Sequence, residues 1–198
     1  MIRHAGVQDI PAVAQIINDA AEYGLMLHRS LSYLYEHVRD FHVVEEKGRV
    51  VGVCGLSIVW GNLAEVYALA VAPDCRKRGL GRQLVLSCVD EAEELGIRRL
   101  MTLTYEKEFF ARAGFQVVDR QELPLKVWSE CVRCAKNQAC DEVAMIRELE
   151  DVPDAAATQM GAAAPAPAPG TYEVPVTLAM SAMRRPVMDK PPPESLIR

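Results

Sequence analysis

Residues 63–95 read LAEVYALAVAPDCRKRGLGRQLVLSCVDEAEEL, and the rest of the chain can be arranged around them. The apolar run Leu63–Val71 predicts a strand. In Leu84–Leu95 apolar residues recur at intervals of three and four, which predicts one face of an amphipathic helix. Between the two, Gly79 and Gly81 remove side chains where the backbone turns. The amides around them can point into one concavity at the positive end of the helix, and such a concavity binds phosphate groups.

These glycines would also suit an ordinary tight turn between a strand and a helix, so their context matters. Arg76, Gly79 and Gly81 fit the pattern R/Q-x-x-G-x-G. Because the pattern follows an apolar strand and opens a helix, the stretch resembles the acetyl-CoA motif of the GNAT acetyltransferase superfamily. A Walker phosphate loop is excluded, since no Gly-Lys-Ser/Thr follows.

Length and composition predict one catalytic domain followed by a tail. The chain has 198 residues, of which 50% are hydrophobic and 25% charged, and these values are ordinary for a globular protein. A net charge of −5 argues against nucleic acid as a partner. No signal-peptide pattern or membrane-spanning run is evident, so we expect a cytoplasmic protein without a membrane partner. Its cysteines should then be reduced, with Cys54 and Cys88 serving as small hydrophobes.

The remaining elements alternate between strand and helix patterns. Strands are expected at residues 2–5, 41–46, 49–60, 98–104, 115–118 and 142–149, and helices after Asp9, at residues 31–41 after Ser30, and at residues 106–113. Lys47-Gly48 predicts a hairpin, so three strands including the one at Leu63–Val71 form an antiparallel meander. The strand at 98–104 follows a crossover, which makes it parallel to the strand at Leu63–Val71. Gly96 and Gly114 should end the helices that precede them.

The pattern changes in the C-terminal third. Residues 124–141 suggest a helical insertion with a cysteine-containing loop. The segment AAATQMGAAAPAPAPG at 155–170 cannot bury enough apolar surface to fold, and it is typical of a polyproline-like linker. We therefore expect the acetyltransferase domain at 1–152, a linker at 153–170 and a disordered tail at 171–198.

The superfamily resemblance implies an α/β fold in which helices flank a mixed, mostly antiparallel sheet of about seven strands. In that fold the fourth and fifth strands splay apart, the pantetheine arm of acetyl-CoA lies in the gap, and its pyrophosphate lies at the helix N-terminus. An amide near Leu69 would stabilise the developing oxyanion. The residues that would bind the cofactor are Leu69, Ala70, Val71, Arg76, Lys77, Arg78, Gly79, Leu80, Gly81 and Arg82.

Two residues are candidates for proton transfer. Glu65 is the only carboxylate on its strand, is expected to share a face with Tyr67 and Leu69, and matches the glutamate base of many GNAT enzymes. The alternative is a solvent-facing glutamate at the start of a strand. Where the superfamily commonly has a tyrosine acid, this chain has Phe110; Tyr105 is the substitute that we name, and protonation of the leaving thiolate by water, or no acid at all, is the alternative.

Outside the cofactor motif, the chain resembles the acetyltransferase domain of bacterial N-acetylglutamate synthase over roughly residues 25–127. The similar stretches are LMLHRSLSYLYEHVRDFHVVEE, LAEVYALAVAPDCRKRGLGRQL, LMTLT and EFFARAGFQVVDRQELPLKV. The resemblance implies L-glutamate as the amine, with Arg29 and Lys126 binding its carboxylates. For each, a solvated surface cation is the alternative. The family's kinase-like N-terminal domain has no counterpart here, so we expect a stand-alone relative, with a homodimer left open.

Cys131, Cys134 and Cys140 form a C-x2-C-x5-C pattern. A structural zinc ion needs four ligands, so the pattern leaves metal binding undecided beside reduced thiols or a redox-sensitive pair. Two further functions stay open: acetylation of another amino acid or of a protein N-terminus, and a CoA-binding regulatory module without catalysis.

Overall fold

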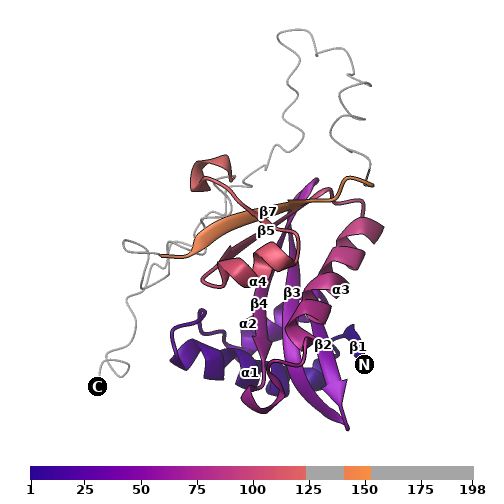
Figure 1. Cartoon of the computed structure of the whole chain (residues 1–198). Coiled ribbons are helices and arrows are strands. Elements are labelled where there is room, and N and C mark those ends of the chain that lie inside the picture. Colours follow the sequence, from indigo (N-terminus) through magenta and orange to yellow (C-terminus); the bar gives the residue numbers. More distant parts are fainter. Residues whose placement is uncertain (124–140, 153–198) are drawn as a thin grey trace, which may run out of the picture. The chain divides into compact units, whose positions relative to one another are not determined.

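The computed structural model describes residues 1–123 and 141–152. All of them belong to the first of two compact units into which the chain divides, Met1–Gly161. They form a seven-stranded sheet in the order β1-β2-β3-β4-β5-β7-β6, with helices packed on it (Figure 1). Only β4 and β5 pair in parallel; every other neighbouring pair is antiparallel. The predicted α/β fold with a mixed sheet is therefore confirmed.

The order of elements along the described chain agrees with the prediction. The strands are β1 (Ile2–His4), β2 (Phe41–Glu46), β3 (Arg49–Trp60), β4 (Leu63–Val71), β5 (Arg99–Thr104), β6 (Gln116–Val117) and β7 (Val143–Glu148). The helices are α1 (Ile10–Glu22), α2 (Leu31–Glu36), α3 (Leu80–Glu94) and α4 (Lys107–Arg112), with 3-10 turns η1 (Val7–Asp9), η2 (Val38–Asp40), η3 (Pro73–Cys75) and η4 (Arg120–Glu122). The last strand, β7, lies between β5 and β6 rather than at the edge of the sheet.

Several helix ends follow the local chemistry that the sequence predicts. The Ser30 hydroxyl accepts a hydrogen bond from the Tyr33 amide at 3.1 Å and caps α2. Gly96 and Gly114 follow α3 and α4 with φ angles of 72° and 89°, a backbone conformation that glycine adopts without steric cost.

One expected cap and two expected helix boundaries were wrong, although α1 does begin directly after Asp9. Asp9 does not cap α1 with its side chain; its carboxylate accepts from the Gly6 amide at 2.7 Å and pairs with Arg3 at 2.6 Å. Helix α2 ends at Glu36, and the chain continues into the 3-10 turn η2. Helix α3 begins four residues earlier than Leu84, because Leu80 is also buried and extends the apolar stripe by one turn.

The sheet separates two main apolar cores. One core lies between the sheet and α3 and includes Leu84, Val85 and Cys88. The other lies between the sheet and α1 and includes Val13 and Ile17. Cys54 and Cys88 are both fully buried in the first core, as expected of small hydrophobes. A hydrogen bond with Cys54, together with burial, raises the pKa of the Cys88 thiol.

Candidate active site

Strands β4 and β5 separate part of the way along their length. They pair at Leu63–Arg99, Ala64–Leu100 and Glu65–Met101. Beyond Glu65, β4 continues to Val71 while β5 pairs only with β7 as far as Thr104. The predicted splay is therefore present, and Glu65 belongs to the last pair before the strands diverge.

Strand β4 contains a β-bulge within this separated part. Gly55 pairs with Tyr67 and Val53 with Ala70, so one residue of β3 faces two residues of β4. The first of these, Ala68, has a φ angle of 50°, which is uncommon for a residue other than glycine. Such backbone strain is typical of functional sites, and a bulge leaves backbone groups outside the ladder, where a ligand can reach them.

The bulge also corrects the expected orientation of Leu69. In an uninterrupted strand Leu69 would share a face with Glu65 and Tyr67. Instead, Tyr67 packs against the core beneath α1, whereas Leu69 packs against the core beneath α3. The extra residue at the bulge shifts the alternation of side chains by one position.

The loop before α3 has the geometry expected of an anion-binding site. Gly79 is the N-cap of α3 with a φ angle of 80°, and a Cβ atom placed there would meet no heavy atom within 4 Å. Lys77 also has a positive φ angle, of 61°. A Cβ atom on Gly81 would lie 3.6 Å from the Phe109 ring and 3.9 Å from Val71. The helix N-terminus is thus open at Gly79, where its amides are accessible to an anion.

The basic residues of this loop differ in how they are held. The Arg76 guanidinium donates to the Val71 carbonyl at 3.0 Å. Arg78 forms a bidentate ion pair with Glu46 of β2 at 2.8 and 2.7 Å, which the sequence did not predict. Lys77 and Arg82 are exposed. The Arg78 charge is therefore shared with Glu46 in this structure.

An open hollow beside Arg78 is lined by Glu46, Arg49 and Asp74, among others. Arg49 pairs with Asp74, as Arg78 does with Glu46. Because each arginine already has a carboxylate partner, this hollow is less suited to an anion than the open helix N-terminus at Gly79.

The candidate proton-transfer residues lie on β4 and directly after β5, the two strands that border the splay. Glu65 is partly buried, with Ser57 opposite it on β3 and Met101 opposite it on β5. Tyr105 is also partly buried and directly follows the end of β5. Phe110 is only 4% exposed and packs edge-on against Phe109 and Phe115. It is a core residue of α4.

Arg29 is held on the α1 side of the sheet. The Asn18 side chain accepts from the Arg29 amide at 2.9 Å and donates to its carbonyl at 3.0 Å. The Arg29 guanidinium lies 4.4 Å from the centre of the Tyr33 ring. Both contacts fix the loop before α2, so that a cation is presented in a defined position.

Tyr67 of β4 lies within electrostatic reach of Arg29, and sequence reasoning did not identify it as a site residue. Burial, and then the charge of Asp40, raises the pKa of the Tyr67 hydroxyl, while the charge of Arg29 acts in the opposite direction. The Tyr67 hydroxyl donates to Asp40 at 3.2 Å. Gly55 makes room for the ring, since a Cβ atom there would lie 2.4 Å from it. The signal that could have identified Tyr67 was Gly55, a glycine of β3 that lies opposite this aromatic residue of β4.

The structure therefore brings Arg29, Tyr67 and Glu65 to one side of the sheet and the loop of α3 to the end of the splay. Residues 124–140 lie outside the described part of the chain, and with them Lys126, Cys131, Cys134 and Cys140. The linker and the tail lie outside it as well.

Residues 11–115 match the acetyltransferase (GNAT) family. An uncharacterized N-acetyltransferase of Chlorobaculum tepidum is 37% identical over 148 residues, which cover 75% of this chain and 96% of the relative. The amino-acid acetyltransferase of Mycobacterium tuberculosis is 34% identical over 136 residues, 67% of this chain and 78% of the relative. The chain belongs to the GNAT acetyltransferase family, and it is an acetyltransferase with acetyl-CoA as its co-substrate.

A solved structure indicates which members of the family this chain resembles. N-acetylglutamate synthase from Neisseria gonorrhoeae, complexed with coenzyme A and N-acetyl-glutamate, matches with a TM-score of 0.69 and 32% identity. The match covers 75% of this chain but only 35% of the gonococcal chain. The resemblance to that family noted in the sequence is thus confirmed. Among the described residues, no helix is long and apolar enough to cross a membrane.

Proposed function

We propose that the protein transfers the acetyl group of acetyl-CoA to the α-amine of L-glutamate. The observation that carries the proposal is that Tyr67 of β4 lies within electrostatic reach of Arg29, and that Glu65, two residues before Tyr67, belongs to the last pair of β4 with β5. A cation that can bind a carboxylate thus accompanies a carboxylate that can take a proton. The similarity to proteins named amino-acid acetyltransferase and N-acetylglutamate synthase supports an amino acid as the substrate. Acetylation would mask the amine and commit glutamate to arginine biosynthesis, as the sequence resemblance implies.

The proposed reaction requires a neutral amine. A free α-amino group is largely protonated near neutral pH, so Glu65 takes a proton from it, directly or through water. The nitrogen then attacks the thioester carbonyl, and an amide near Leu69 stabilises the oxyanion that forms. The nitrogen that has attacked carries a positive charge and loses a second proton to water. When the tetrahedral intermediate collapses, the C–S bond breaks and the CoA thiolate leaves. Tyr105 or water protonates that thiolate.

The substrate's two carboxylates need cationic partners that leave the amine available. Arg29 is proposed for one of them, because its position is fixed by Asn18 and Tyr33. Lys126 is the candidate for the second on the basis of sequence alone. The cytoplasmic location and a homodimeric assembly likewise stay predictions from the sequence.

The test combines a substrate panel with two variants that should fail differently. Consumption of acetyl-CoA is measured with free amino acids and with peptides, and glutamate should give the highest kcat/KM. Glu65→Gln should lower kcat by roughly 10² to 10⁴ and shift the remaining activity to higher pH, where the amine loses its proton unaided. Full activity of Glu65→Gln at neutral pH would show that another group is the base.

Arg29→Ala should raise KM for glutamate and leave KM for acetyl-CoA nearly unchanged. Loss of a charge-assisted hydrogen bond costs about 1.5 to 3 kcal/mol, or roughly tenfold to more than a hundredfold. His28→Ala is the matched control, since His28 is the neighbouring residue, is exposed and contacts Glu22 at 3.2 Å. If Arg29→Ala leaves KM for glutamate unaltered, the acetyltransferase assignment stands and the dicarboxylate substrate does not.

A further inference from the structure

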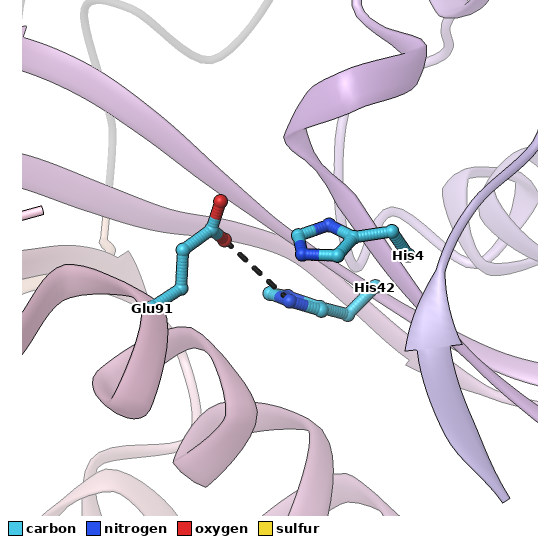
Figure 2. Close-up of side chains that lie close together, drawn as sticks. All are labelled: His4, His42 and Glu91. Atoms are coloured by element: carbon cyan, nitrogen blue, oxygen red, sulfur yellow. Dashed lines mark ion pairs between the residues drawn. The ribbon is translucent and has the colours of Figure 1, made fainter. Parts of the chain in front are cut away.

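A polar cluster lies at the edge of the sheet on its α3 side, away from the splay. His4 of β1 and His42 of β2 are cross-strand partners, so their side chains share one face. Glu91 projects toward them from α3 (Figure 2). Three residues that commonly bind metal ions thus meet from three separate elements, although they are far apart in the sequence.

The ligand atoms of the cluster lie close together. One atom each from His4, His42 and Glu91 falls within 4.8 Å of the other two. The His42 Nε2 atom lies 3.5 Å from Glu91 Oε2, and the centroids of the His4 and His42 imidazole rings are 4.4 Å apart. Bonds of about 2.0–2.2 Å to a tetrahedral zinc ion separate ligand atoms by roughly 3.3–3.6 Å. The His42–Glu91 pair already has this spacing, and His4 is exposed enough to rotate inward.

The second nitrogen of His42 is also held in place. Its Nδ1 atom lies 3.5 Å from the Cys88 sulfur, and the His42 side chain is only 5% exposed. In protein metal sites, a contact at one ring nitrogen orients the imidazole so that the other nitrogen faces the ion. Cys88 would have this supporting role here, with His42 Nε2 as the ligand atom.

Glu91 gives an independent indication that a cation belongs in the cluster. Its Oε2 atom is buried and has no hydrogen-bond partner among the residues that the structure describes. Buried polar atoms are normally paired, because leaving one unpaired costs free energy. The atom nearest to it in the cluster, His42 Nε2, is a nitrogen that can itself bind a cation.

We propose that His4, His42 and Glu91 bind a divalent transition-metal ion, with zinc as the best match. Two imidazoles and one carboxylate suit zinc better than calcium or magnesium, which prefer oxygen ligands alone. Water can complete the coordination from the exposed side of His4. Glu91 is 11 residues beyond the start of α3 at Leu80, or about 16 Å along the helix. The ion would therefore fasten α3 to strands β1 and β2 rather than take part in acetyl transfer.

The experiment uses the full chain, stripped of metal with a chelator and then titrated with zinc chloride. We expect one tight equivalent by calorimetry and a rise in Tm of roughly 5 to 10 °C when free zinc is about 100-fold above Kd. His4→Gln and Glu91→Gln should each weaken this binding at least about tenfold. His28→Gln, which changes an exposed histidine elsewhere, should bind zinc as the unaltered protein does. His42 is left unchanged, because its burial makes misfolding a competing explanation.

Cobalt distinguishes this cluster from the C-x2-C-x5-C thiols. Co²⁺ bound by nitrogen and oxygen gives weak visible bands, whereas thiolate ligands add intense charge-transfer absorption. The unaltered protein should show the weak bands alone, and His4→Gln should lose them. Equal zinc-dependent Tm shifts in the unaltered protein and in both variants would overturn the proposal, as would weak cobalt bands that persist in His4→Gln. Absence of any zinc binding by the unaltered protein would overturn the proposal outright.

Discussion

Gly81 offers a way to separate cofactor binding from folding. It is the second residue of α3, and a Cβ atom there would meet Phe109 at 3.6 Å, an ordinary contact distance. Gly81→Glu should therefore fold. Its carboxylate would lie in the first turn of the helix, where a negative charge contributes about 0.3–1 kcal/mol of stability. The free energy of unfolding should stay within about 1 kcal/mol of that of the unaltered protein.

The same carboxylate should prevent acetyl-CoA from binding, because it would occupy the place proposed for the pyrophosphate. Two unit charges about 5 Å apart repel by about 3 kcal/mol at an effective dielectric constant near 20. This repulsion alone weakens binding more than a hundredfold. Gly81→Gln has the same shape without the charge and should lose less affinity. Added salt should recover part of the difference between the two variants.

Calorimetric titration with acetyl-CoA and unfolding in urea measure the two properties separately. Gly96→Ala provides the opposite control, at the other end of α3. Its φ angle of 72° is strained for alanine, so this variant should lose about 1–2 kcal/mol of stability and keep its affinity for acetyl-CoA. An unchanged Kd for Gly81→Glu would refute the pyrophosphate site at this helix N-terminus.

Three further outcomes follow from other parts of the chain. Hydrogen bonding to Arg3 lowers the pKa of Asp9, so this carboxylate stabilises the fold above its unfolded pKa and the effect is lost as pH falls through the folded value. Asp9→Asn should thus cost about 1.5–3 kcal/mol in urea unfolding at pH 7 and clearly less at pH 3. Gly55→Ala should destabilise by about 1–3 kcal/mol, because the new methyl group overlaps the Tyr67 ring at 2.4 Å; a loss below about 0.5 kcal/mol would contradict this packing. Truncation after Val152 should leave kcat/KM nearly unchanged, given the composition of the segment that follows, and a tenfold loss would show that the tail contributes to the site.

The strands and helices could be predicted because their signals are local. The β-branched runs of β2 and β3, the Lys47-Gly48 turn and the serine cap at Ser30 each depend on residues close in the sequence. The loop of α3 was identified for the same reason, since its glycines and its basic residues are consecutive. Even the parallel pairing of β4 and β5 follows from the helical crossover between them.

The features that sequence reasoning missed depend on partners distant in the chain. Nothing near Arg78 indicates that Glu46, 32 positions away, would form an ion pair with it. The cluster of His4, His42 and Glu91 likewise forms only through the register of β1 with β2 and the position of α3. Such contacts become visible once the topology is known, because pairing between strands and packing of a helix both determine which faces meet.

The bulge in β4 was also missed, and it has the largest consequence for the proposed reaction. An uninterrupted strand would place Glu65, Tyr67 and Leu69 on one face. With the extra residue at Ala68, the groups proposed to meet the amine face the α1 side, whereas Leu69 packs on the side of α3. In the proposed reaction one strand would then serve the substrate and the cofactor from opposite faces, with its backbone at the bulge between them. We therefore propose that the strained φ angle at Ala68, 50°, is a cost in stability retained for the chemistry of the site.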